Sequence, residues 1–189
     1  KDMATLTPTL TLVSTDALSD SLNLSVTDSL SVLGQTKRFT KVLALTATDI
    51  LLAADYTKSY VFMQNKSSTT AEIITIGKKS TDATCDYNDA TGVTMDSTAN
   101  VSFGMTVSGT GIHASATVAS VTNTTTIVIS ETTTGGAKSN ETLTFGMEEF
   151  IILGPGEFCF LPWDSTQDLE AISASGTPTL EVMIFQAAA

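Results

Sequence analysis

The chain of 189 residues carries 20 aspartates and glutamates against 9 lysines and arginines, so its formal net charge is −11. This acidic balance argues against a nucleic-acid-binding protein, because neutralising phosphates requires lysine and arginine side chains. The sequence contains no run approaching the ~20 apolar residues of a membrane-spanning helix, so we expect neither nucleic acid nor membrane among the partners. The length suits one good core or two small ones.

Residues 1–34 are predicted to form an extended N-terminal arm. Leucine or valine alternates with polar residues in segments such as Leu10–Leu12 and Leu22–Val26, and a period of two is typical of strands. Such an arm can fold onto its own domain or add a strand to a neighbouring copy through main-chain hydrogen bonds. The sequence leaves both options open, and Leu10 and Leu12 become candidate partner-binding residues.

Lys37, Arg38 and Lys41 form the one basic cluster of the sequence. They suit a strand whose charged side chains face water. The alternative is contact with an acidic surface on a partner, which an otherwise acidic protein needs at a docking site. These three residues are therefore further candidates for partner binding.

Two apolar runs within Tyr60–Gly77 are separated by a polar segment, and this pattern predicts a β-hairpin. The run Phe158–Trp163 predicts a further strand, and 169–174 with 180–185 flank the turn-forming residues 175–178, which predicts a terminal hairpin. Short strands with regularly spaced turns are typical of a sandwich or jelly roll. We therefore predict an all-β protein with a β-sandwich or jelly-roll-like domain.

A stretch rich in threonine, serine and glycine interrupts that domain. Its clearest alternating strands are Thr117–Val121 and Thr126–Ser130. The predicted organisation is therefore a discontinuous β-sandwich at 35–80 and 147–189, with a small β-module inserted at 81–146.

The sequence contains no recognisable catalytic motif. His113 is the only histidine, and it lies in a glycine-rich bend without the nucleophile elbow of a hydrolase. Oxygen-bearing side chains at 82–89 lack the spacing of a calcium loop, and the acidic residues at 148–168 flank turns, as a solvated rim would. Cys85 and Cys159 match no metal or redox motif and are expected to be free thiols. We expect no enzymatic activity, no metal and no cofactor.

Trp163, Phe158, Phe160 and Tyr60 allow two interpretations. They suit an aromatic platform for a surface glycan, or side chains of the sandwich core. The core is preferred, because alternate members of such a run must be buried in a sandwich. An exposed Trp163 beside a groove would favour the glycan.

Several patterns resemble virion structural proteins of tailed bacteriophages. The stretch from Gly92 to Ser130, with its Gly-Thr-Gly-Ile bend, resembles a small β-module that recurs in those proteins, although His113 stands where the module usually has proline. The outer domain resembles small phage head or tail decoration proteins in its Ile74–Gly77 run and its Leu153–Glu157 turn. The opening Met3–Leu12 resembles that of virion proteins from phages of cyanobacteria.

This resemblance implies a non-enzymatic virion structural protein, namely a capsid decoration or cement protein that stabilises the outer shell. Its partners would be the major capsid protein and copies of itself in a homotrimer, and its location would be the capsid surface of the virion. Two alternatives stay open: a tail, baseplate or fibre component, and a carbohydrate-binding β-sandwich that uses Trp163.

Overall fold

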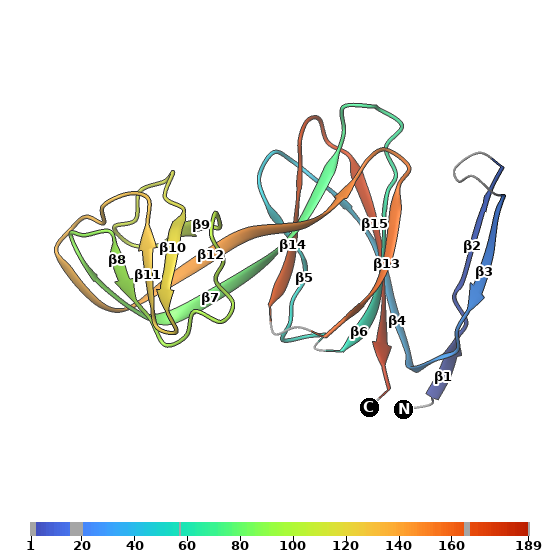
Figure 1. Cartoon of the computed structure of the whole chain (residues 1–189), viewed down its shortest axis with the longest axis horizontal. Helices are drawn as coiled ribbons and strands as arrows, with labels where there is room; N and C mark the ends of the chain where they lie inside the picture. The colour runs from blue at the N-terminus through green and yellow to red at the C-terminus, as the bar shows by residue number, and fades with distance from the viewer. Residues whose placement is uncertain (1–2, 16–20, 57, 165–166, 189) are drawn as a thin grey trace.

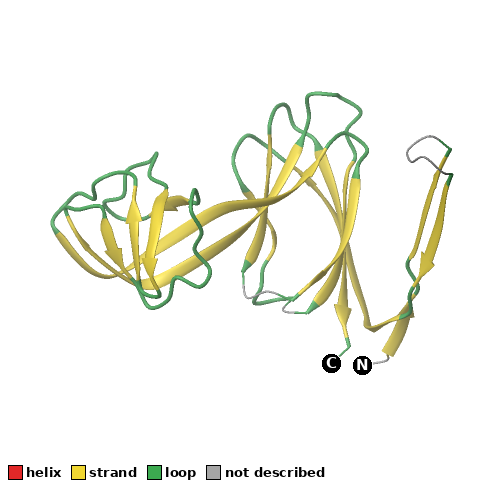
Figure 2. Cartoon of the chain, in the orientation of Figure 1, coloured by secondary structure: helices red, strands yellow, loops and turns green. Residues whose placement is uncertain are grey.

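The computed structural model describes residues 3–15, 21–56, 58–164 and 167–188, and every regular element in those ranges is a β-strand (Figure 2). Figure 1 shows three parts in a row: a hairpin near the N-terminus, a sandwich in the middle and a smaller β-unit at the far end. The predicted all-β, sandwich-like class is confirmed. The strands are β1 (Met3–Leu6), β2 (Thr9–Ser14), β3 (Leu22–Thr27), β4 (Leu30–Val42), β5 (Thr48–Leu51), β6 (Ser59–Asn65), β7 (Ile74–Asn88), β8 (Gly92–Thr94), β9 (Thr106–Ser108), β10 (Val118–Asn123), β11 (Thr126–Ile129), β12 (Ala137–Leu153), β13 (Phe158–Trp163), β14 (Asp168–Ser173) and β15 (Thr179–Ala187).

The central part is a sandwich of two antiparallel sheets. One sheet has the strand order β4-β15-β6-β13, with β1 added beside β4, and the other has the order β5-β14-β7-β12. Strands that follow each other in the chain, such as β4 and β5 or β12 and β13, lie in opposite sheets. This is the strand order of a jelly roll, in which two four-stranded sheets pack face to face.

The predicted hairpin at Tyr60–Gly77 is wrong. β6 pairs with β13 and β15, whereas β7 pairs with β12 and β14, so the two strands belong to different sheets. Both runs are apolar because alternate side chains of each strand point into the sandwich interior. Buried examples are Val61, Met63, Ile74 and Ile76. The predicted terminal hairpin is wrong for the same reason, since β14 and β15 lie in opposite sheets.

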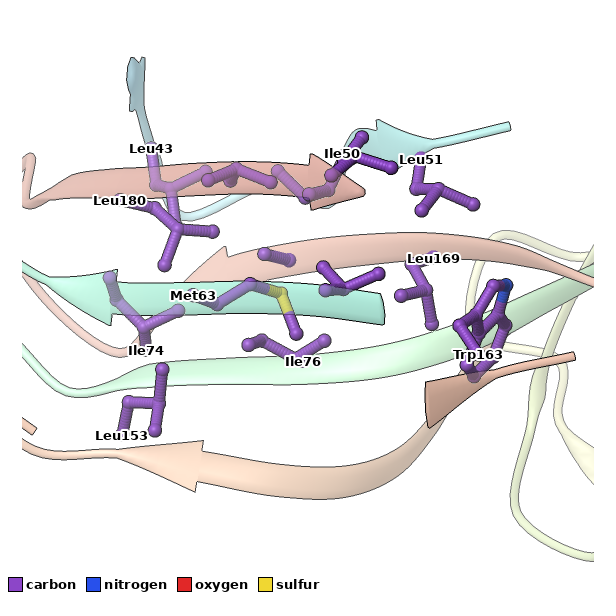
Figure 3. Close-up of a cluster of buried hydrophobic side chains, with 14 residues drawn as sticks. Leu43, Ile50, Leu51, Met63, Ile74, Ile76, Leu153, Trp163, Leu169 and Leu180 are labelled. Carbon is purple, nitrogen blue, oxygen red and sulfur yellow. The ribbon is translucent and has the colours of Figure 1, made fainter. Parts of the chain in front are cut away.

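The main hydrophobic core lies between the two sheets of the sandwich (Figure 3). Both sheets supply its side chains, because each strand points every second residue inward. Among its members are Leu43, Ile50, Leu51, Met63, Ile74, Ile76, Leu153, Trp163, Leu169 and Leu180.

A second hydrophobic cluster forms the core of the smaller β-unit. β7 and β12, of 15 and 17 residues, run from the sandwich into this unit, where β8, β9, β10 and β11 complete its sheet. Cys85, Leu143 and Phe145 are fully buried there, together with apolar side chains between residues 93 and 129. The two clusters share no residue, so each unit has a core of its own.

A β-bulge marks the place where β12 passes from one unit to the other. The pairing with β7 shifts between Phe145 and Glu148, and Met147 adopts a left-handed φ of 56°. Gly146 leaves little room for a side chain, because a Cβ would lie 3.0 Å from both Glu170 Oε1 and Thr106 Oγ1. The buried Glu170 carboxylate accepts a 2.7 Å hydrogen bond from the Met147 amide, which gives the displaced backbone group a partner.

We expect Phe145→Ala to destabilise the smaller unit by about 3–5 kcal/mol, because the change empties a fully buried site. The matched control is Phe103→Ala in the same unit, where the ring is 80% exposed and the effect should stay within about 0.5 kcal/mol. Urea unfolding followed by circular dichroism measures both. Equal effects of the two changes would contradict the assignment of this core.

Candidate interaction surface

The hairpin of β2 and β3 has one apolar face. Leu10 pairs with Val26 and Leu12 with Leu24, and directly opposite residues of an antiparallel pair point to the same side. These four side chains are 42–52% exposed, and Figure 1 shows the hairpin standing apart from the sandwich. The intervening positions are mostly serine, threonine and asparagine, which make the other face polar.

A short base attaches the hairpin to the sandwich. β1 pairs with the start of β4, and the Asp28 amide donates a 3.1 Å hydrogen bond to the Pro8 carbonyl where the chain passes into the hairpin. A two-stranded hairpin alone is marginally stable in water. Covering its half-exposed aliphatic side chains would contribute about 1 kcal/mol for each of them. A partner on this face would therefore stabilise the hairpin substantially.

The outer face of β6, β13 and β15 is unusually apolar for a sheet surface that no further layer of the described residues covers. Side chains along β6 alternate strictly between buried and half-buried, so the half-buried set points outward. Register places neighbouring outward residues of the three strands side by side. We call this surface the aromatic face, and its members are Tyr60, Phe62, Phe158, Phe160, Pro162, Met183 and Phe185.

Ring stacking orders the aromatic face. The ring centroids of Tyr60 and Phe160 lie 6.2 Å apart and those of Phe62 and Phe158 lie 5.9 Å apart, within the range of aromatic pairs. Phe158 is nevertheless 60% exposed and Phe160 37%. The surface continues round the edge of the sandwich into a groove of about 720 Å³ between the end of β12 and the start of β13.

Neither the strands of the hairpin nor the centre of the aromatic face carries a charge. Residues 9–14 and 21–27 include no acidic or basic side chain. The charged neighbours of the aromatic face, Arg38 and Glu181, form an ion pair with each other. In a chain of net charge −11, these are surfaces that a partner can approach without strong like-charge repulsion.

The predicted basic cluster is divided between two sides of β4. Arg38 forms its ion pair on the outer face, whereas Lys37 and Lys41 line a cleft of about 360 Å³ beside β5. Lys37 Nζ lies 5.5 Å from the ring centroid of Phe39 and 5.7 Å from that of Tyr56, within the range of a cation–π contact. The structure therefore brings Lys37 and Lys41 together and separates Arg38 from them.

Trp163 does not present the exposed ring that a glycan platform needs. It is 6% exposed, belongs to the sandwich core and stacks on Phe150 with ring centroids 6.0 Å apart. The preference for a core position is right for Trp163 and wrong for Phe158 and Phe160, because β13 turns those two rings outward. The residues on both sides of this strand are apolar, so the sequence holds no signal that separates inward from outward positions.

The polar side chains singled out in the sequence serve the local fold. His113 Nδ1 lies 2.9 Å from Ser115 Oγ in an exposed turn. Asp82, Asp86 and Asp89 each accept a hydrogen bond from a backbone amide. Within the described ranges, no group of three or more histidine, cysteine, aspartate or glutamate side chains is arranged to hold a metal ion.

Both cysteines are free thiols in poorly solvated positions. Burial raises the pKa of Cys85 to about 12 and that of Cys159 to about 11. The reactive form of cysteine is the thiolate, so neither side chain is activated as a nucleophile at neutral pH.

No family model, curated protein or solved structure matches this chain. In the part of the chain that the structure describes, no helix has the length and apolar character needed to cross a membrane.

Two glutamates near the β-bulge have pKa values shifted in opposite directions. Hydrogen bonds from Lys78 and Ser102 lower the pKa of Glu148 below its ordinary value of 4.5. Burial raises the pKa of Glu170 above the same value of 4.5, against the effect of the hydrogen bond from Met147. The stabilisation from Glu148 is thus present above pH 4.5 and is lost as the pH falls through its lowered pKa. Glu170 favours the folded state at low pH, and that contribution is lost as the pH rises through its raised pKa.

We expect Glu148→Gln and Glu170→Gln to change the pH dependence of stability in opposite senses. On lowering the pH from about 7 to about 3, the advantage of the wild type over Glu148→Gln should shrink, because its carboxylate becomes protonated. The stability of the wild type relative to Glu170→Gln should instead rise over the same range. Urea unfolding at each pH measures both differences, and two differences that move in the same direction would contradict the pKa assignments.

Proposed function

We propose that this chain is a non-enzymatic virion structural protein, a capsid decoration protein that attaches to an outer shell and associates with copies of itself. The observation that carries the proposal is that the hairpin and the aromatic face lie uncovered on a protein with two well-buried cores. Contiguous exposed apolar surfaces of this kind mark protein interaction sites. The resemblance of the sequence to phage decoration proteins supports the same class.

The three-part arrangement supports an attached end and a projecting end. The hairpin lies on one side of the sandwich, and β7 and β12 carry the smaller unit out on the other side (Figure 1). With the hairpin side towards the particle, the smaller unit would project from it. Many repeated contacts of this type can stabilise a shell even when each contact is modest.

Lys37 and Lys41 are the residues proposed to meet the shell. They line one cleft at the β4–β5 side of the sandwich together with Asp49 and Asp55, and Asp49 is paired with Lys79. On a chain with 20 acidic residues, the ammonium groups of these two lysines are the ones proposed to pair with acidic side chains of the partner.

The proposal is tested by co-sedimentation with undecorated shells assembled from the major capsid protein of the same genome. We expect binding that saturates in proportion to shell area, and we expect the double change Lys37→Glu and Lys41→Glu to weaken it, because complementary charges become like charges. Lys138→Glu makes the same kind of change in the smaller unit, where the Lys138 ammonium donates to the Gly135 carbonyl, and should bind as the wild type does.

Binding to isolated tails but not to shells would replace the capsid assignment with a tail, baseplate or fibre component. Binding to neither particle would contradict a virion structural role. Equal binding of the lysine double variant and the wild type would contradict the docking site alone.

A further inference from the structure

We propose that the apolar side of the β2–β3 hairpin of one copy packs against the aromatic face of a second copy. The inference deepens the self-association that belongs to the proposed function and rests on it for biological context. It differs from strand addition, because β2 and β3 already pair with each other and the contact would be made by side chains.

The two surfaces match in size and chemistry. The hairpin strands have six residues each, and they would lie on β13 and β6, which have six and seven. At the rise of an extended strand, all of these elements are about 20 Å long. The hairpin offers branched aliphatic side chains and the sheet offers flat rings, a combination that packs well on a pleated surface.

Charge favours a second copy as the occupant. Two acidic copies repel each other wherever their carboxylates face, and the hairpin and the aromatic face are uncharged at their centres. A contact between these two surfaces therefore lets the copies meet without placing carboxylates opposite one another.

The connectivity favours a neighbouring copy over the chain's own sheet. The hairpin leaves the sandwich beside β4, where β1 pairs, whereas β6 and β13 lie towards the opposite edge of the order β1-β4-β15-β6-β13. The hydrogen bond between Asp28 and Pro8 ties the two hairpin strands together at their base. The hairpin thus leaves from one edge of the sheet, whereas the aromatic face extends from the central strand β15 to the opposite edge at β13.

Exchange also gives each copy a second buried surface. A stable interface of standard size buries about 800 Å² on each partner, and one hairpin of two six-residue strands is small for this. In a reciprocal pair or a closed ring, every copy donates one hairpin and accepts another. Each copy then buries two surfaces instead of one.

Disulfide trapping between chains tests the inference. Cys159→Ala serves as the background, because Cys159 adjoins the aromatic face in sequence, and the fully buried Cys85 is retained. One chain then carries Leu12→Cys and a second, tagged chain carries Phe160→Cys. After mixing and mild oxidation we expect a disulfide between the two different chains, identified by peptide mass spectrometry.

The matched control moves the hairpin cysteine to the other face. Val13 is next to Leu12 and 70% exposed, but it points to the polar side. Val13→Cys mixed with Phe160→Cys should therefore give little mixed disulfide. Equal trapping from both hairpin positions would overturn the proposed packing.

A single chain that carries both Leu12→Cys and Phe160→Cys distinguishes exchange from folding back. A disulfide within one chain would overturn the inference in favour of the chain's own sheet. Light scattering gives an independent outcome: we expect Leu12→Asp to reduce the wild-type oligomer to the 19.8 kDa monomer and Val13→Asp to leave it intact. A wild type that is monomeric at all concentrations would also overturn the inference.

The two proposals fail separately. Trapped oligomers that ignore shells and tails would support the hairpin contact and contradict the virion role. A monomeric wild type that still sediments with shells would support the virion role and contradict the hairpin contact.

Discussion

Strands β7 and β12 pair from Ile74 to Asn88 and therefore belong to both hydrophobic cores. Among the described strands, these two are the ones that the smaller unit shares with the sandwich, and hydrogen bonds from Gln167 to the Asn100 carbonyl and from Ser102 to Glu148 also join the two units. A long ribbon of two strands would bend freely if its backbone groups were unpaired at the junction. At the bulge the Met147 amide is not left unpaired, because the buried Glu170 carboxylate from β14 accepts a hydrogen bond from it. The side chain of a sandwich strand thus fixes the point where the ribbon leaves the sandwich.

The apolar residues of the chain fall into two groups, one buried in the two cores and one exposed on sheet surfaces. Those in the two cores come from strands whose partners lie across a sandwich or within the smaller unit. Those on the hairpin and the aromatic face lie on sheet surfaces without a covering layer. Sheets with one face bare of polar residues normally bury that face. The apolar surface exposed on the hairpin and the aromatic face would be buried if another molecule supplied the covering layer.

Sequence patterns predicted the all-β sandwich because residues of period two recur along most of the chain. They failed at the connections, since two apolar runs around a polar segment describe both a hairpin and a crossing between sheets. The sequence therefore predicts hairpins at 60–77 and 169–185, although the two strands of each pair lie in opposite sheets. The alternation predicts Leu10 and Leu12 as candidate contacts, and they lie on the exposed apolar side of the hairpin.

The aromatic face could not be predicted in the same way. Along β13 every residue is apolar, so the alternation that separates inside from outside is missing. Only the pairing with β6 decides which side chains point outward, and that pairing joins segments about a hundred residues apart. The separation of Arg38 from Lys37 and Lys41 likewise follows from strand geometry, because neighbouring residues of a strand point to opposite sides.

Hydrogen exchange measured by mass spectrometry over a range of protein concentrations tests the central claim, that the hairpin and the aromatic face are covered by another copy. The account predicts that amides of β2 and β3 become protected as the concentration rises, together with those of β13, while β10 and β11 in the smaller unit exchange at a constant rate and serve as the internal reference. Hairpin amides that exchange equally fast at every concentration would contradict it.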